Sequence, residues 1–395
     1  MIADLHVHYP MRVLEDLTPT TTDDRLGELA RRLRFGEKLE GLFIRSLGRF
    51  LSDRDPHAGY RVTVEGLRAG EVGVVLSALY RPLDEMDLSK GYAAPPDARY
   101  FDLLIRDLER VEAEVEGHRD PQLIRVVHDV GELDAARADA AIAVVHCVEG
   151  GFHLGDTPEH VAANVAELAA RGVAYITVAH LFFRQIAATA PALPFLKTDA
   201  AYDVLFPQPP GIGLTGLGEA AVTAMVDNGV LVDLSHMRTD AVMETLDLLD
   251  RLDDARTIPV ISSHAGFRFG DQDYMVSEPM LERICDRNGV VGLILAQHQL
   301  NDGLFEGHTT AFAETKAIIF RHVDRIAQVT GGYDHLAIGS DLDGFIRPTA
   351  TGLESSADLP RLERALRERY DGEDVDKILS GNVLRVLRDG WGRRP

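Results

Sequence analysis

Eight short apolar runs recur along the 395-residue chain, and side chains that favour metal ions follow several of them. The runs are rich in Val, Ile, Leu and Ala, which is typical of strands covered on both faces in a parallel sheet. They span Ile2–His8, Val72–Tyr80, Ala141–Val148, Ala174–His180, Val230–His236, Ile258–His264, Val290–Ala296 and His335–Asp341. This repetition predicts a fold built on eight parallel strands.

Helix-like stretches with spaced apolar residues separate most of these runs. They are Glu159–Arg171, Leu217–Asn228, Ala241–Leu252, Met280–Arg287, Ala311–Val329 and Leu359–Glu368. Gly172, Gly229 and Gly289 follow three of the stretches, at positions typical of helix ends. Strands that alternate with helices indicate βαβ units, and eight such strands suit a closed TIM-like (β/α)8 barrel of the α/β class. A doubly wound sheet would usually carry a Gly-rich turn after its first strand, whereas His-Tyr-Pro follows here.

The length suits one barrel domain over residues 1–395, because such a barrel needs about 250 residues and tolerates insertions. We expect a helical insertion at about residues 22–55 and a Pro-rich insertion at about 184–213, with a shorter loop at 81–96. Long loops at the catalytic face usually shape or cover a pocket. The last helical segment, Val375–Arg388, is expected to close the opposite end of the barrel.

The composition favours a small-molecule partner. A formal net charge of −22 would repel nucleic acid, and no Lys/Arg-rich run with aromatic residues offers a binding site for it. Cys147 and Cys285 lack the spacing of a zinc knot or a disulfide framework. No apolar stretch reaches the ~20 residues that span a membrane, and the first strand begins almost at Met1. We therefore expect a cytoplasmic protein with no membrane segment.

The first predicted strand carries two histidines that could bind one ion. Side chains alternate along a strand, so Asp4, His6 and His8 are expected to share the face that points into the barrel. An H-x-H pair alone is also common at the edge of an ordinary core. The other strand ends strengthen the metal-binding interpretation.

The third predicted strand ends in a glutamate that lies beside two glycines. Glu149 follows a long apolar run, and a carboxylate buried there needs a cation, which could be a metal ion or an arginine at the rim. Gly150 and Gly151 allow a tight turn after it. His146 has the opposite parity and is expected to face the surrounding helices as a structural residue.

Two further strands end alike, in Leu-Ser-His236 and Ser-Ser-His264, so both imidazoles are expected at the same height in the barrel. The last strand ends in Gly-Ser-Asp341-Leu-Asp343-Gly. We interpret Asp341 as a ligand or base and Asp343 as support for the loop.

These groups suit two metal ions. Two imidazoles and a carboxylate could hold one ion and two imidazoles the other, with Glu149 between them. A pair of metals about 3.5–4 Å apart can activate water and polarise a carbonyl. No G-x-S-x-G elbow, nucleophilic cysteine, P-loop or dinucleotide fingerprint is present, so metal-assisted hydrolysis is the favoured chemistry.

Motifs along nearly the whole chain resemble the membrane (renal) dipeptidase family of the amidohydrolase superfamily. The motifs are V-E-G-G at 148–151, Y-I-T-V-A-H at 175–180, G-L-T-G-L-G at 213–218, V-D-L-S-H at 232–236, I-S-S-H at 261–264, G-S-D-L-D-G at 339–344 and G-N-V-L-R-V at 381–386. None of the lysines ends a predicted strand, so a carbamylated lysine does not bridge metals here as it does in many related barrels.

The resemblance implies two zinc ions and a dipeptide or similar small amide as substrate. Glu149 would bridge the ions, with His236 and His264 on one and the first strand and Asp341 on the other. Asp341 would also shuttle a proton, and His180 would contact the substrate and stabilise the oxyanion. A homodimer is plausible by the same resemblance.

Two positions depart from the family pattern. The family usually has H-x-D after its first strand, whereas this chain has His6-x-His8. The family also places an arginine after the sixth strand, where it grips the peptide carboxylate, and Tyr274 occupies that position here. Arg268 is close enough in sequence to replace it as a substrate-binding residue.

Two alternative functions remain open from the sequence. D-L-H-V-H at 4–8 also begins barrels of the polymerase-and-histidinol-phosphatase type, which are metal-dependent phosphoesterases. A barrel that keeps its metals but serves only as a binding protein is the other alternative. A phosphomonoester assay separates the first from a dipeptidase, and metal analysis with a turnover assay separates the second.

Overall fold

The computed structural model describes residues 1–395 except 17–59, 86–91, 195 and 197–198. The strands are β1 Ile2–Val7, β2 Val72–Leu79, β3 Ile124–Val127, β4 Ile142–Glu149, β5 Tyr175–Thr177, β6 Leu231–Asp233, β7 Ile261–Ala265, β8 Val290–Leu293 and β9 Leu336–Ile338. The helices are α1 Pro10–Asp16, α4 Val64–Ala69, α5 Pro82–Glu85, α6 Arg99–Glu116, α7 Val130–Ala138, α8 Pro158–Ala170, α9 Asp199–Leu205, α10 Gly216–Asn228, α11 Thr239–Leu252, α12 Glu278–Asp286, α13 Gln297–Leu300, α14 Phe312–Thr330, α15 Leu359–Arg367, α16 Gly372–Asp376 and α17 Asn382–Gly390.

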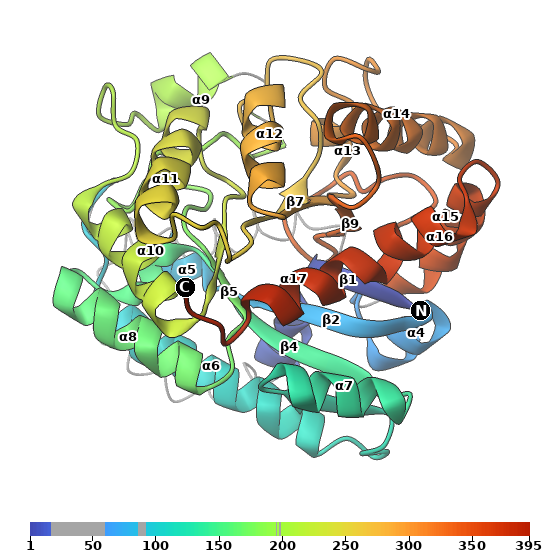
Figure 1. Ribbon diagram of the computed structural model, residues 1–395, viewed down its shortest axis with the longest axis horizontal. Coiled ribbons are helices and arrows are strands. Elements are labelled where there is room, and N and C mark those ends of the chain that lie inside the picture. The colour runs from blue at the N-terminus through green and yellow to red at the C-terminus, as the bar shows by residue number, and fades with distance from the viewer. Residues whose placement is uncertain (17–59, 86–91, 195, 197–198) are drawn as a thin grey trace, which may run out of the picture.

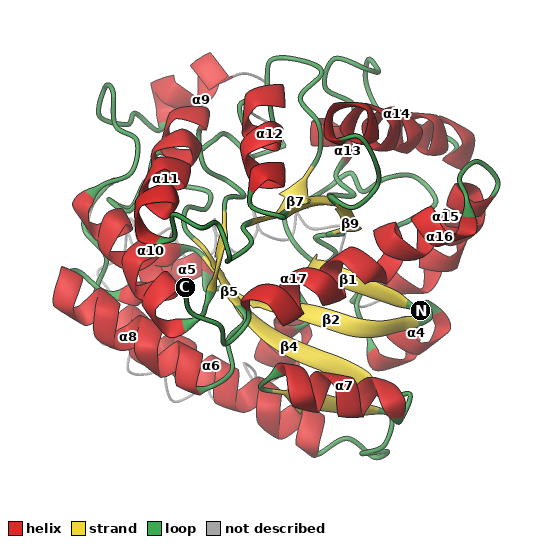
Figure 2. Cartoon of the chain, in the orientation of Figure 1, coloured by secondary structure: helices red, strands yellow, loops and turns green. Residues whose placement is uncertain are grey.

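Eight of the nine described strands form a closed parallel barrel. The order around it is β1, β2, β4, β5, β6, β7, β8 and β9, and β9 pairs with β1 to complete the ring. Helices surround the strands on the outside (Figures 1 and 2). The predicted (β/α)8 architecture is therefore confirmed, and all eight strands direct their carboxyl ends to the same face.

The predicted pattern lacked β3 and the helices on either side of it, α6 and α7, as well as the short helices α1, α4, α5 and α13. β3 pairs with the first half of β4 outside the ring, while β2 and β5 also pair with β4. α6 precedes β3 and α7 follows it. The predicted insertion at 22–55 lies outside the described residues, and the one at 184–213 contains α9.

Local sequence explains where several helices begin and end. Thr215 accepts a hydrogen bond from the backbone N–H of Gly218 at the start of α10, and Gly229 ends that helix with φ +69°. Thr157 caps α8 in the same way, with Pro158 as its first residue. Side-chain caps and a left-handed terminal glycine satisfy backbone groups that a helix leaves unpaired. These caps set the points at which the chain turns back towards β5 and β6.

The interior of the barrel is filled by small and medium apolar side chains and is closed at the amino-terminal end by α17. Ala3, Leu5 and Leu76 pack there with Val383 and Leu387 of α17, all buried. This arrangement matches the predicted role of segment 375–388. The sealed floor leaves the opposite end of the barrel as the open face.

β1 departs from the simple alternation that the sequence suggested. Leu5 packs in the interior cluster, and the pairing with β2 has a register shift between Asp4 and Val7. The shift is the physical reason why His6 also reaches the interior. Asp4 lies in different surroundings from His6. Its carboxylate accepts hydrogen bonds from the backbone N–H and the hydroxyl of Ser340.

Three smaller expectations can be compared with the structure. His146 lies with Nε2 3.6 Å from the Glu112 carboxylate of α6, so it faces the helices as predicted. Cys147 and Cys285 are both free thiols, the first buried and the second half-buried. Among the described helices, none combines the length and the apolar character needed to cross a membrane.

Candidate metal centre

Strand ends on both sides of the barrel bring together the six residues predicted as metal ligands. His6 and His8 come from β1 and the residue after it, Glu149 ends β4, and His264 lies near the end of β7. His236 and Asp341 follow β6 and β9. All six are buried. The structure therefore collects residues from positions 6 to 341 at the open face.

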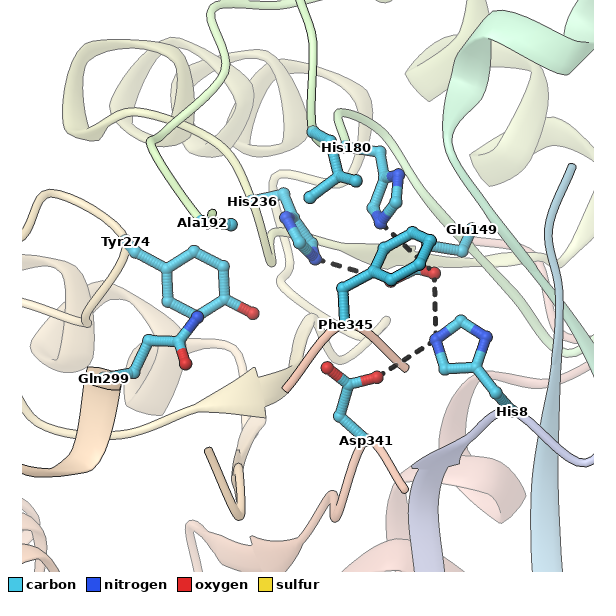
Figure 3. Close-up of a pocket in the computed structure, with 10 residues that line it drawn as sticks. His8, Glu149, His180, Ala192, His236, Tyr274, Gln299, Asp341 and Phe345 are labelled. Atoms are coloured by element: carbon cyan, nitrogen blue, oxygen red, sulfur yellow. Dashed lines mark ion pairs between the residues drawn. The ribbon is translucent and has the colours of Figure 1, made fainter. Parts of the chain in front are cut away.

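Glu149 lies at the centre of this group. Its Oε1 is 3.3 Å from Nε2 of His6 and 3.4 Å from Nε2 of both His236 and His264. Its Oε2 is 3.3 Å from Nε2 of His8 and 3.4 Å from Nε2 of His180. Figure 3 shows Glu149 pointing into the pocket between His8, His180 and His236. One carboxylate thus contacts imidazoles on both sides.

The donor atoms fall into two main groups. His6, His8 and Asp341 form one, with His8 Nε2 3.0 Å from the Asp341 Oδ1 atom. Glu149, His236 and His264 form the other, in which the two histidine Nε2 atoms lie 2.9 Å apart. These are the two sets expected from the sequence. Nitrogen and carboxylate donors at such spacing suit divalent metals.

A third group of possible donors is already occupied by hydrogen bonds. It contains Asp233 with His6 and His264. Asp233 Oδ1 accepts from the backbone of Ser235 and Ser263, and its Oδ2 accepts from the hydroxyls of Thr177 and Ser263. With four donors on one carboxylate, Asp233 acts as a support for its neighbours and not as a free ligand.

Two of the predicted ligand histidines, His6 and His264, are held with Nε2 unprotonated. The Tyr175 hydroxyl donates to the carbonyl of Leu5 at 3.0 Å, so the His6 Nδ1–H must donate to the Tyr175 oxygen at 2.7 Å. Likewise the Ser263 hydroxyl donates to Asp233, so His264 Nδ1–H donates to Ser263 at 2.8 Å. In each ring the remaining lone pair lies on Nε2, the atom that faces Glu149.

Electrostatics favour metal-binding protonation states at His236, Glu149 and Asp341, whereas at His8 burial acts to lower the pKa and the charges of Glu149 and Asp341 raise it to about 9. Burial lowers the pKa of His236 to about 4, with a further contribution from the charge of His180, so His236 is a neutral imidazole. Burial alone would raise the pKa of Glu149, but the charges of His180 and His8 hold it well below its usual range. Burial also acts to raise the pKa of Asp341, and the His8 imidazole, whose Nε2 lies 3.0 Å from Oδ1, outweighs that effect. Both carboxylates are ionised.

The backbone is strained at two of these positions. His236 has φ +66° and Asp341 has φ +56°, values that side-chain-bearing residues rarely adopt. Such strain clusters at functional sites, where the surrounding fold holds it. Gly150 has φ +96°, and a Cβ on Gly151 would lie 2.7 Å from the Val178 carbonyl oxygen, so the tight turn after Glu149 requires both glycines.

The centre forms one side of a pocket at the open face (Figure 3). Its lining consists of His8, Glu149, His180, Leu181, Ala192, His236, Tyr274, Gln299, Asp341 and Phe345. His180 and Tyr274, both predicted to contact substrate, are therefore present. The Tyr274 hydroxyl donates to the carbonyl of His264 at 3.0 Å.

The structure does not bring Arg268 into this pocket. Its guanidinium donates to the Asp273 carboxylate at 2.8 Å and to the Met275 carbonyl at 2.9 Å. It lines a separate cavity of about 590 Å³ that also contains Arg238 and Asp203. Among the described residues that line the metal-side pocket, none is an arginine or lysine.

Several residues around the centre were missed by sequence reasoning. Tyr175 is hydrogen-bonded to Nδ1 of His6, and Glu85 to Nδ1 of His180. Gln299 and Phe345 line the pocket. Tyr175 belongs to a motif that the sequence did reveal, at 175–180. Glu85 and Gln299 lie in four-residue helices whose sequences carry no periodic signal. Asp343 does support its loop, since it accepts from the backbone of Arg61 and Val62.

Comparison with known proteins identifies the family. Residues 40–390 match the model of the family described as membrane dipeptidase, Peptidase family M19. The chain is 27% identical over 340 residues to Dipeptidase tcpJ of Claviceps purpurea, an alignment that covers 83% of this chain and 69% of that protein.

Two solved structures share the fold. A metallo peptidase from Rhodobacter sphaeroides, liganded with a phosphinate mimic of the dipeptide L-Ala-D-Ala, has a TM-score of 0.72 and 17% identity with 99% of each chain covered. The probable dipeptidase PvdM from Pseudomonas aeruginosa has a TM-score of 0.63 and 18% identity, covering 85% of this chain and 90% of that one. The family is metal-dependent, in keeping with the donor groups at the open face. The chain belongs to the membrane dipeptidase family of metallopeptidases, Peptidase family M19.

Proposed function

We propose that this protein hydrolyses the amide bond of dipeptides or similar small amides with two zinc ions. The observation that carries the proposal is the central position of Glu149, whose two oxygens lie 3.3–3.4 Å from five imidazoles. A carboxylate with donors on both sides is what a pair of ions requires of a bridging ligand.

The residues present fit such ions. His6 Nε2, Glu149 Oε2 and Asp341 Oδ1 are buried without a hydrogen-bond partner. Buried polar atoms are normally paired, so three unpaired acceptors in one place favour the binding of a cation there. Most of the donors are imidazole nitrogens, which suit zinc better than magnesium or calcium.

The two sets of donors would hold one ion each. His6, His8 and Asp341 would hold the first and His236 with His264 the second, with Glu149 between them. Zinc, when bound, lowers the pKa of water and polarises a carbonyl group.

The chain itself supplies the groups that position substrate and move protons. Asp341 is nearly buried, ionised and in the pocket, and its Oδ1 has no hydrogen-bond partner. It is therefore suited to take a proton from the attacking water and return it to the leaving amine. His180 lines the same pocket and can face the substrate oxygen on which negative charge develops.

The substrate's carboxylate has no arginine partner among the described lining residues, where Tyr274 and Gln299 present neutral polar groups. We therefore include in the proposed substrate class small amides whose carboxyl end is capped. The Rhodobacter sphaeroides relative holds a mimic of L-Ala-D-Ala, so dipeptides with a D-residue at the carboxyl end belong in the same test.

The test is a turnover assay on zinc-loaded protein with metal content measured on the same sample. The panel contains L,L and L,D dipeptides, their carboxamides, N-acyl amino acids and a phosphomonoester. Hydrolysis of a dipeptide or its amide with two zinc ions per chain supports the proposal. Turnover of the phosphomonoester alone, or bound zinc with no turnover, would favour one of the two alternative functions instead.

A further inference from the structure

Glu85 is a buried carboxylate next to the pocket that the proposed chemistry has not yet used. It ends the short helix α5 after β2, a strand that supplies none of the six predicted ligands, and is 1% exposed. Its Oε2 accepts from the Nδ1–H of His180 at 2.7 Å and from the Tyr80 hydroxyl at 2.7 Å. Its Oε1 accepts from the backbone N–H of Phe182 at 3.0 Å.

These bonds connect the segment after β2 to the segment after β5. His180 and Phe182 both lie beyond β5, and Arg184 donates to the backbone carbonyl of Glu85 at 2.8 Å. Tyr80 stacks edge-on to the His180 ring with centroids 4.3 Å apart. The ring is therefore held by a hydrogen bond at Nδ1 and by an aromatic contact at its side.

The hydrogen bond also decides which nitrogen faces the substrate. With Nδ1–H donated to Glu85, Nε2 is the nitrogen directed at the pocket wall, where it lies 3.4 Å from Glu149 Oε2 (Figure 3). A carboxylate that accepts from one imidazole nitrogen fixes the orientation of the ring and stabilises its doubly protonated form, in which the other nitrogen is an N–H donor. A displacement of about 1 Å in such a group can cost about 10²-fold in rate.

We propose that Glu85 is a positioning residue of this enzyme, which fixes His180 with Nε2 directed at the substrate in the pocket. The inference rests on the proposed function. It adds a residue that touches neither substrate nor metal and that acts through His180 alone.

The substitution Glu85→Gln tests this role. The carboxylate accepts from three donors, Tyr80 O–H, His180 Nδ1–H and Phe182 N–H, whereas an amide must turn its NH2 group towards one of them. We expect kcat to fall by about 10²-fold with little change in KM and with zinc content unchanged. Near wild-type kcat in Glu85→Gln would overturn the proposal.

A double-mutant cycle separates positioning from general support of the fold. If Glu85 acts through His180, Glu85→Gln in the His180→Ala background lowers kcat by no more than about twofold further. Fully additive losses would contradict the proposal. Asp253→Asn is the matched control, because Asp253 is a buried carboxylate that accepts from Thr257 and Ile258 beyond α11, far from the open face. It should lower stability and leave kcat unchanged.

A measurement on the wild-type protein keeps the proposal testable if Glu85→Gln does not fold. Nitrogen NMR of the histidine rings, assigned with His180→Ala, should show a hydrogen-bonded proton on Nδ1 of His180. A ring protonated only at Nε2 would refute the inference. Absence of turnover of every dipeptide and amide in the panel by the wild type would instead refute the proposed function, so the two failures are distinguishable.

Discussion

Hydroxyl groups next to the ligand histidines determine which ring nitrogen is free. Tyr175 and Ser263 each donate their own proton elsewhere, to Leu5 and Asp233, and so can only accept from the imidazole. Tyr175 and Ser263 therefore set the tautomer of His6 and His264, although neither is itself a proposed metal ligand. Such supporting contacts are expected to matter for metal affinity almost as much as the ligands do.

Tyr175→Phe should weaken zinc binding by about 10–100-fold, because the His6 Nδ1–H loses its acceptor and the ring its orientation. The affinity can be measured by competition with a chelating dye. Tyr370→Phe is the control, since its hydroxyl bonds Asp324 at the outer surface. Equal affinities in the two variants would show that Tyr175 does not orient the ligand.

Asp341→Asn should lower kcat by about 10²–10⁴-fold while some zinc stays bound, because the amide keeps the shape of the side chain but accepts protons poorly. Steady-state kinetics with metal analysis on the same preparation gives both quantities. A variant with near-normal turnover would remove Asp341 from the proton-transfer role.

Contacts between helices and loops position the rim of the pocket. His322 of α14 accepts from the backbone N–H of Phe267 through Nδ1, at 3.1 Å, and donates through Nε2 to the carbonyl of Leu300, at 3.0 Å. It thereby ties α14 to the segment after β7 and to the end of α13. Tyr274 and Gln299, which line the pocket, lie on those same two segments.

This contact predicts a loss of stability in mild acid. Burial lowers the pKa of His322 from 6.5 to about 4, and protonation would set Nδ1–H against the Phe267 N–H. The unfolded state therefore binds a proton more readily, so the stabilisation is complete above pH 6.5 and is lost as the pH falls towards 4. The change in unfolding free energy is about 3 kcal/mol at most.

Urea unfolding of wild type and His322→Gln at several pH values measures the effect. Glutamine can accept and donate as the neutral ring does, but it does not titrate. We expect the wild type to lose stability relative to the variant between pH 6.5 and 4. If the unfolding free energies of the two proteins change with pH in parallel, His322 is not the group responsible for the loss of stability.

Elements could be predicted from the sequence where their apolar residues recur with a clear period or where they end in a recognisable residue. Glu149, His236 and His264 were predicted because each follows an apolar run at the same strand end. β3 was missed because it has four residues and lies between polar stretches, outside the ring. Glu85 was missed because its partner His180 is 95 residues away, a proximity that only the closed barrel creates.

The distribution of ligands along the sequence links metal binding to the stability of the entire barrel. The first proposed ligand lies at residue 6 and the last at 341, and β1 pairs directly with β9. An ion bound by both ends is bound only in the folded state, so it stabilises that state by mass action. A zinc concentration 100 times the dissociation constant adds about 2.7 kcal/mol for each site.

Removal of metal should therefore lower the unfolding temperature. Calorimetry of zinc-loaded protein with and without a chelator is the measurement, and added zinc should restore the transition. His236→Ala, which lacks one ligand, should show a smaller shift on chelation. Identical transitions with and without chelator would mean that no metal is bound in the folded protein.

The pairing of β1 with β9 also has a consequence for synthesis in the cell. A ribosome makes His6 early and Asp341 late, so the growing chain lacks the last of the six proposed ligands until translation is almost finished. Ions cannot be captured in their final positions while the protein is still emerging. Maturation of this hydrolase is therefore expected to begin only after the last strand has left the exit tunnel.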